Sequence, residues 1–339
     1  MPRAFISGCL GVALERDEKA FLRDADPWGL IVFKRNVASQ ERLLALTSDF
    51  RDAVGRADAP VFVDQEGGRV QRLGPPHWRA YPAAALFEKA GDGQGGARAA
   101  WLSARLIAHD LRAAGIDVNC APVLDVADEA THAVIGTRAF SHSPDATARL
   151  ARAYAEGLVA GAVAPVLKHI PGHGRARADS HLELPKVDAS LDALRQRDFV
   201  PFAMLRDIPM AMSAHIVFTA IDPVSPATTS AKVVSEIMRG EIGYDGLIIS
   251  DDLSMKALSG TFAEKTRAVF AAGLDVALHC NGDRTEGAPV AANAPVLAGR
   301  SLERAERGLA ATRRAPEPLD VEAAAAELRG YLGIVDAGR

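Results

Sequence analysis

Eight short apolar segments recur along the chain, and stretches with helical periodicity separate them. Two of these segments read Leu30-Ile31-Val32-Phe33 and Leu247-Ile248-Ile249, with no alternation of polar and apolar residues. Strands that are apolar on both faces belong to a parallel sheet covered by helices, so these segments predict such a sheet. The predicted strands are residues 4–11, 29–34, 60–65, 117–124, 163–168, 209–215, 246–251 and 275–280.

The intervening segments predict helices, and Gly115, Gly161 and Gly273 each stand where a helix must end before the next strand. Eight strands alternating with helices predict an α/β fold of the (β/α)8 TIM barrel type, which typically needs about 250 residues. A doubly wound sheet is the alternative, but no glycine-rich phosphate turn follows the first strand. We expect one barrel over residues 1–290 and a tail of helices packed on it over residues 291–339. The predicted helices are residues 15–24, 40–54, 97–114, 145–160, 191–206, 230–240 and 261–272.

Composition narrows the class of partner and the compartment. The chain has 339 residues with 39 Lys and Arg against 43 Asp and Glu, a net charge of −4, which offers no broad basic surface for nucleic acid or anionic membrane. Cys9, Cys120 and Cys280 form no CxxC pair, which argues against a disulfide scaffold or structural zinc site and fits a reducing compartment. We therefore expect a cytoplasmic monomer that binds a small molecule and neither nucleic acid nor membrane.

The N-terminal apolar run, residues 4–14, requires a separate interpretation. It is shorter than the roughly 20 residues of a membrane-spanning helix. Ile6-Ser7-Gly8-Cys9 resembles a lipoprotein cleavage box, but a cysteine at position 9 leaves little room for the apolar region of a signal peptide. We expect a first buried strand here.

Polar residues end or directly follow seven of the eight predicted strands. Examples are Asp64 at the end of the third, Lys168 and His169 at the end of the fifth, and Asp251 at the end of the seventh. In a (β/α)8 barrel the carboxyl ends of the strands surround the active site. Ordinary loop polarity would explain one such end, whereas seven of them favour an enzyme.

The densest group of ionisable residues is Lys168-His169-Ile170-Pro171-Gly172-His173-Gly174, followed by Asp179-Ser180-His181. Three interpretations compete for it. The histidines and Asp179 could bind a metal, although their spacing is loose and the HEXXH pattern and CxxC pairs are missing. The histidines could be merely solvated, or Asp179 and His181 could form an acid/base pair. Residues two apart in an extended segment project to one side, and a carboxylate there would hold the imidazole tautomer and raise its pKa.

Two further signals are carboxylates. Asp251 ends a buried strand, where a carboxylate is costly unless it is solvated, paired or used, and it could attack a sugar carbon as a nucleophile. Asp64 and Arg72 flank a turn with paired glycines and would offer an acceptor and a donor to sugar hydroxyls. A salt-bridged loop is an equally good interpretation of that segment.

Taken together, these motifs resemble the family 3 glycoside hydrolases, in particular the bacterial single-domain β-N-acetylhexosaminidases. They occur in the family's order over about residues 28–281. The residues that carry the resemblance are Asp64-Gln-Glu-Gly-Gly-Arg-Val-Gln-Arg72, Ala121-Pro-Val-Leu-Asp125, Ile135-Gly-Thr-Arg138, Lys168-His-Ile-Pro-Gly-His-Gly174, Asp179-Ser-His181, Ala214-His215 and Ser250-Asp-Asp-Leu-Ser-Met255.

The resemblance implies a retaining β-N-acetylglucosaminidase that needs no metal or organic cofactor. Asp251 would be the nucleophile that forms a covalent glycosyl-enzyme, and His181 the general acid/base polarised by Asp179, where most glycosidases use two carboxylates. The substrate would be an N-acetylglucosaminyl-anhydromuropeptide from peptidoglycan recycling. The residues implied to bind its terminal sugar are Asp64, Arg72, Arg138, Lys168 and His169.

Three other functions stay open at this point. Phosphate instead of water could resolve the glycosyl-enzyme, which would make the chain a phosphorylase. The histidine-rich loop could serve a metal-dependent hydrolase. The chain could also bind sugar without turning it over, although the set Asp179, His181 and Asp251 argues against this.

Overall fold

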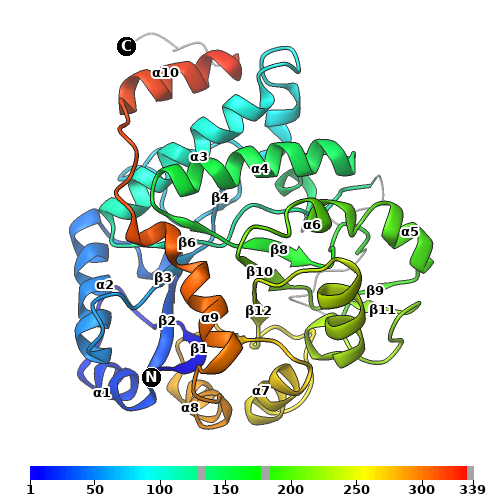
Figure 1. The fold of residues 1–339 in the computed structure, drawn as a ribbon. Helices are drawn as coiled ribbons and strands as arrows, with labels where there is room; N and C mark the ends of the chain where they lie inside the picture. Colours follow the sequence, from blue (N-terminus) through cyan, green and yellow to red (C-terminus); the bar gives the residue numbers. More distant parts are fainter. Residues whose placement is uncertain (129–134, 177–183, 334–339) are drawn as a thin grey trace.

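The computed structural model describes residues 1–128, 135–176 and 184–333. Its main sheet has nine parallel strands in the order β7-β6-β3-β2-β1-β13-β12-β10-β8. The two end strands are consecutive in the chain, separated only by Val166, and a bridge from Val123 to Lys168 joins the remaining gap, so the sheet closes into a barrel (Figure 1). The strands are β1 (Arg3–Ser7), β2 (Pro27–Val32), β3 (Val61–Val63), β6 (Val118–Asn119), β7 (Ala164–Pro165), β8 (Leu167–Ile170), β10 (Met210–Ser213), β12 (Leu247–Asp252) and β13 (Val276–His279).

The predicted (β/α)8 barrel is confirmed, since each of the eight predicted strand segments contributes to this sheet. The predicted segment 163–168 is divided into β7 and β8, which pair with opposite neighbours. Helices cover the outside of the barrel and follow the strands in turn. They are α1 (Arg16–Ala25), α2 (Gln40–Val54), α3 (Gly96–Ala113), α4 (Pro144–Ala160), α5 (Leu191–Gln196), α6 (Val200–Met204), the π-helix η5 (Val233–Glu241), α7 (Phe262–Ala271) and α8 (Arg284–Asn293).

The helix predicted over residues 191–206 is two helices, α5 and α6. Pro201 lies in the first turn of α6, where its missing N–H costs nothing, but it could not continue a helix from α5. Asp198 occupies the break, and its buried carboxylate accepts a hydrogen bond of 2.7 Å from Arg175 Nε. The break therefore connects α6 to the loop that follows β8.

Short strands and 3-10 helices lie in the connections between the barrel strands and the helices. An antiparallel hairpin, β4 (Gln65–Gly67) and β5 (Val70–Gln71), follows β3. A parallel pair, β9 (Lys186–Val187) and β11 (Val217–Phe218), joins the segment that precedes α5 to the segment that follows β10. Four 3-10 helices lie in the connections: η1 (Lys34–Asn36), η2 (Ala84–Lys89), η3 (Gly136–Arg138) and η4 (Ala227–Thr229).

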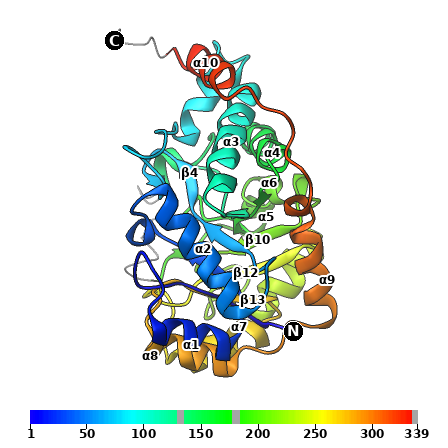
Figure 2. The same ribbon diagram turned by 90° about the vertical axis from the view of Figure 1, so that its left-hand side faces the viewer.

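The tail after α8 contains α9 (Gly299–Gly308), η6 (Ala310–Arg313) and α10 (Val321–Tyr331). Figures 1 and 2 show α9 lying across one end of the barrel and α10 lying against α3 at the periphery. Leu297, Ala305 and Leu309 join the apolar cluster inside the barrel, so α9 closes the amino ends of the strands. Helix α10 is held to α3 by a bidentate ion pair between Arg98 and Glu327.

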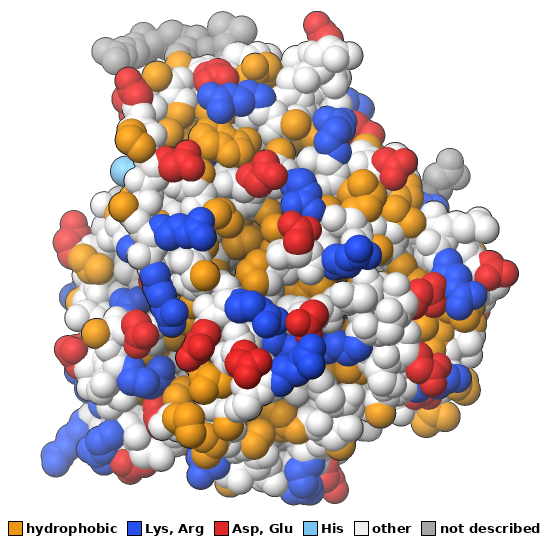
Figure 3. Space-filling view, in the orientation of Figure 1, with side chains coloured by type: hydrophobic (Ala, Val, Ile, Leu, Met, Phe, Trp, Pro, Cys, Tyr) orange, Lys and Arg blue, Asp and Glu red, His pale blue; other side chains and the backbone are white. Residues whose placement is uncertain are grey.

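The surface of this end carries mixed charge. Figure 3 shows Lys and Arg side chains interspersed with Asp and Glu over the face on which α9 lies. In the described part of the chain, no helix is both long enough and apolar enough to cross a bilayer.

Candidate active site

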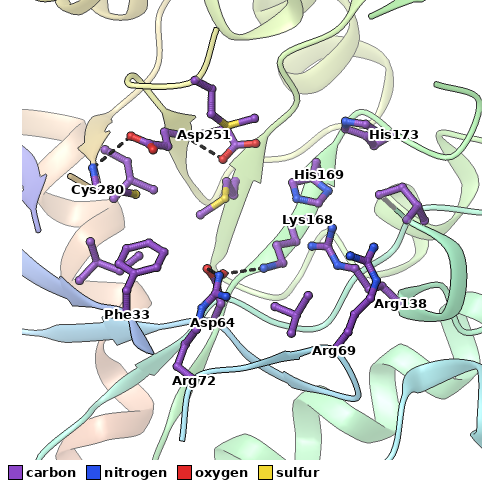
Figure 4. A pocket seen from close by; sticks show the side chains of 17 residues that line it. Phe33, Asp64, Arg69, Arg72, Arg138, Lys168, His169, His173, Asp251 and Cys280 are labelled. Carbon is purple, nitrogen blue, oxygen red and sulfur yellow. Dashed lines mark hydrogen bonds and ion pairs between the residues drawn. The ribbon is translucent and has the colours of Figure 1, made fainter. Parts of the chain in front are cut away.

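A cavity of about 270 Å³ opens at the carboxyl ends of the barrel strands. Its wall comes from the ends of β2, β3, β8, β10, β12 and β13, from the β4–β5 hairpin and from η3. Figure 4 shows Asp251 on one side of it and Asp64, Arg72, Lys168 and Arg138 across from it. The structure thus brings together the predicted site residues that it describes.

Asp64 is the centre of one charged group. Its Oδ1 accepts from Lys168 Nζ at 2.8 Å and its Oδ2 from Arg72 Nη2 at 2.9 Å. Burial alone would raise the pKa of the Asp64 carboxyl, but Lys168 and Arg72 outweigh it and hold that pKa well below its usual range. An ionised acceptor beside two donors is suited to binding sugar hydroxyls.

Glu66 links Arg138 to the charged group around Asp64. Glu66 was not among the predicted site residues. Its Oε1 lies 2.6 Å from Lys168 Nζ, and its carboxylate accepts from Arg138 Nε at 2.7 Å and from Arg138 Nη2 at 2.8 Å. The residue is buried and stands two positions after Asp64, so a strand-like segment sends both side chains to one side. That spacing was the available signal for it.

Each charged residue in this group keeps its neighbours in their ionised forms. Burial alone would lower the pKa of Lys168, but Asp64 and Glu66 overcome it, so the pKa of the ammonium is raised and Lys168 stays charged. Burial alone would raise the pKa of Glu66, but Arg138 and Lys168 outweigh it and lower that pKa. The wall opposite Asp251 is therefore a network of fixed charges.

The hairpin β4–β5 brings Arg72 to the cavity. The turn uses Gly67 and Gly68 at φ values of 101° and 58°, and a Cβ on Gly67 would lie 2.2 Å from the carbonyl oxygen of Pro82. The side-chain oxygen of Gln65 then accepts from the backbone N–H of Arg72 at 2.8 Å. This confirms the sharp turn that the paired glycines predict.

Asp251 and Asp252 end β12 and both line the cavity, but their carboxylates make different contacts. Asp251 lines the cavity, and its Oδ1 accepts from the backbone N–H of Asp252 at 2.8 Å. Oδ1 of Asp252 accepts from the backbone N–H groups of Ser254 and Cys280, both at 3.0 Å. Asp252 therefore fixes the turn and the neighbouring strand end, while the Asp251 carboxylate is presented to the cavity.

His169 lies in β8 and His173 follows that strand, and both are bound to the carboxylate of Asp125. Asp125, fully buried after β6, accepts from His169 Nδ1 at 2.7 Å and from the backbone N–H of His173 at 2.7 Å. Burial alone would raise the pKa of Asp125, but His169 outweighs it and lowers that pKa to about 2. Burial lowers the pKa of His173 to about 4, and His169, whose ring centroid lies 5.4 Å away, adds to the effect.

Asp179 and His181 lie outside the described residues. Among the residues that are described, no group of three His, Cys, Asp or Glu side chains is arranged to hold a metal ion. The roles of Asp179 and His181, and the pairing between them, stay predictions.

Comparison with known proteins places this site in a family. The model of the glycosyl hydrolase family 3 N terminal domain matches residues 6–307. The β-hexosaminidase of Methylococcus capsulatus is 41% identical over 276 residues, which are 80% of this chain and 81% of that protein. The β-hexosaminidase of Chromobacterium violaceum is 40% identical over 302 residues, which are 88% of this chain and 84% of that protein.

The same result comes from solved structures. NagZ from Neisseria gonorrhoeae, in complex with N-trifluoroacetyl-D-glucosamine, superimposes with a TM-score of 0.81 and 32% identity, covering 98% of this chain and 99% of that chain. The chain thus belongs to the family 3 glycoside hydrolases, as its motifs predict. Within that family it is a bacterial β-N-acetylhexosaminidase of the NagZ type.

Proposed function

We propose that the chain is a retaining β-N-acetylglucosaminidase in which Asp251 is the nucleophile. The observation that carries the proposal is the Asp251 carboxylate in a cavity whose opposite wall holds the charged group around Asp64 and Lys168. A carboxylate oxygen of Asp251 attacks the anomeric carbon from the face opposite the leaving oxygen, and the glycosidic bond breaks as the glycosyl–Asp bond forms.

His181 supplies the proton that the leaving oxygen needs, and Asp179 holds its imidazole in the required tautomer. In the second step His181 takes a proton from water, the water oxygen attacks the anomeric carbon, and the Asp251 carboxylate is released. These roles are supported by the Asp179-Ser180-His181 spacing and by the family motif. They are also supported by the order of the chain, since residues 179–181 follow β8, whose residues Lys168 and His169 line the cavity.

The terminal N-acetylglucosamine binds to Asp64, Arg72, Arg138, Lys168 and His169. All five line the cavity, and together they offer cationic donors, a carboxylate acceptor and an imidazole, the chemistry that sugar hydroxyl and amide groups require. Each interaction is charge-assisted where it involves Asp64 or one of the cations, which strengthens hydrogen bonds to a neutral sugar.

The biological substrate that we propose is an N-acetylglucosaminyl-anhydromuropeptide, cleaved in the cytoplasm by a monomer during peptidoglycan recycling. Cys9, Cys120 and Cys280 are all buried free thiols, which supports a reducing compartment. The small net charge of −4 supports a local binding site for a small substrate over a polymer-binding surface. Residues 1–290 would form the barrel and residues 291–339 the tail, although α8 crosses that division.

The direct test is hydrolysis of a chromogenic aryl N-acetyl-β-glucosaminide by the wild type and by Asp251→Ala. We expect the substitution to lower kcat/KM by about 10³-fold or more, because no covalent intermediate can form. The matched control is Asp207→Ala, which removes a carboxylate that pairs with Arg152 on the outer surface, and it should keep wild-type rates. Robust activity in Asp251→Ala would refute the nucleophile assignment, and a rate that requires phosphate would identify a phosphorylase instead.

A further inference from the structure

Within the described part of the chain, the hydrogen bonds of Asp125 go to one short segment, residues 169–173. Its Oδ1 accepts from the backbone N–H groups of His169 at 3.1 Å and of His173 at 2.7 Å, and its Oδ2 lies 2.7 Å from His169 Nδ1. Its exposed fraction is 0%, and it does not line the cavity. A buried carboxylate with this arrangement can act on a ligand only through the residues that it holds.

The contact between Asp125 and His169 determines which ring nitrogen carries hydrogen. An ionised carboxylate can only accept, so Nδ1 of His169 must be the donor in the 2.7 Å contact. The two backbone N–H groups that donate to Oδ1 stabilise the ionised form of this carboxylate as well. In neutral imidazole the other nitrogen, Nε2, then has a lone pair and no hydrogen.

His169 presents that nitrogen to the cavity. Its ring lines the cavity beside Lys168 and across from Asp64 (Figure 4). Because Nδ1 is turned to Asp125, Nε2 is the ring nitrogen available to a bound sugar. The neighbouring His173 is uncharged at neutral pH, since burial lowers its pKa to about 4, and so does not compete for Asp125 as a cation.

We propose that Asp125 is a positioning residue that fixes His169 Nε2 as a hydrogen-bond acceptor, so that the site requires a sugar hydroxyl that donates at this position. The proposal rests on the proposed function in one respect, the contact of His169 with the terminal sugar. It adds a specificity determinant: a ligand group that can only accept, such as fluorine, is disfavoured at that position.

Asp125→Asn should reverse the role of Nε2 with almost no change in shape. The two backbone N–H groups at Oδ1 require an acceptor there, which orients the new amide with its oxygen toward the backbone and its NH₂ toward His169. That NH₂ donates to Nδ1, so the hydrogen of the imidazole moves to Nε2. The same reversal of tautomer by an Asp-to-Asn change is known to impair histidine catalysis in a serine protease.

The experiment compares aryl N-acetyl-β-glucosaminides that carry hydroxyl or fluorine at carbons 3, 4 and 6 in turn. At one of these positions we expect the wild type to prefer hydroxyl by about ten-fold or more in kcat/KM, the effect of one lost hydrogen bond to a polar site. Asp125→Asn should narrow that preference and leave the preferences at the other two positions unchanged. The control is Asp275→Asn, at a carboxylate that is also buried but lies at the amino ends of the strands, and it should leave all three preferences as in the wild type.

A structural role alone would give a different pattern. If Asp125→Asn lowers kcat/KM equally for every analogue, or leaves the hydroxyl preference intact, the proposal is wrong. Nitrogen-15 NMR of the wild type tests it without any variant at Asp125: we expect the neutral imidazole of His169, assigned by its loss in His169→Gln, to carry hydrogen on Nδ1 only. Hydrogen on Nε2 would overturn the proposal. This measurement stands even if Asp251→Ala remains active and the proposed function fails.

Discussion

At the scale of single residues, the cavity wall depends on a lysine that is 2% exposed. An ammonium in that position is costly unless carboxylates compensate it, and Lys168 has two, Asp64 at 2.8 Å and Glu66 at 2.6 Å. Arg138 shares Glu66 with it. Glu66 therefore holds two of the proposed sugar-binding cations without lining the cavity itself.

We predict that Glu66→Gln raises KM for the chromogenic substrate by about ten-fold, because Lys168 and Arg138 lose the charge that orients them. It should also move the alkaline limb of kcat/KM to lower pH. The sign follows from Lys168. Glu66 helps to raise the pKa of its ammonium against burial and the nearby Arg138, so without that charge the pKa falls and the ammonium deprotonates at lower pH. A pH–rate profile of both proteins measures this.

The control for Glu66 is Glu66→Asp, which keeps the charge but shortens the side chain. It should weaken sugar binding and leave the alkaline limb close to that of the wild type. An unchanged alkaline limb in Glu66→Gln would show that Glu66 does not control the ionisation of Lys168.

At the scale of elements, α9 is the helix that seals the barrel. Ala305 of α9, Leu297 just before the helix and its C-cap residue Leu309 pack into the interior from the end opposite the cavity. Arg304 and Ser301 donate to the buried carboxylate of Asp275 at 3.0 and 2.7 Å, which fixes the helix against the start of β13. The helix thus contributes to stability and lies far from the chemistry.

We predict that Leu309→Ala lowers the free energy of unfolding by about 2 to 4 kcal/mol, because it opens a cavity in the barrel interior. KM for the chromogenic substrate should not change. Urea unfolding measures the loss, with Leu44→Ala, 47% exposed on α2, as the control expected to cost about 0.5 kcal/mol or less. A stability loss in Leu309→Ala no greater than that control would contradict the role assigned to α9.

The sequence predicts the strands and helices better than it predicts the points at which they are divided. Apolar runs and helical periodicity predict every barrel strand and most helices, because burial of each strand on both faces leaves a local pattern. The division of residues 163–168 into β7 and β8 depends on barrel closure, which is not local. Asp64 and Lys168 could be predicted from strand ends and motifs, whereas the roles of Glu66 and Asp125 depend on partners distant in sequence, Arg138 and His169.

At the scale of the whole molecule, one end of the barrel forms the candidate active site and the other end contributes to stability. The carboxyl ends of the strands carry the charged cavity, with Asp251 facing the group around Lys168, and the amino ends are closed by the apolar side of α9. This separation lets the loops after the strands vary in chemistry without disturbing the core. It also explains why substitutions at α9 and at the cavity are expected to affect different measurements.

The central claim, a glycosyl-enzyme on Asp251, is tested most directly by the configuration of the first-formed sugar. Proton NMR during hydrolysis of an aryl N-acetyl-β-glucosaminide distinguishes the two anomers before they equilibrate. Two successive displacements at the anomeric carbon restore the original configuration, so the account predicts β-N-acetylglucosamine as the first product. Initial release of the α anomer would mean one direct displacement by water and would contradict a covalent intermediate on Asp251.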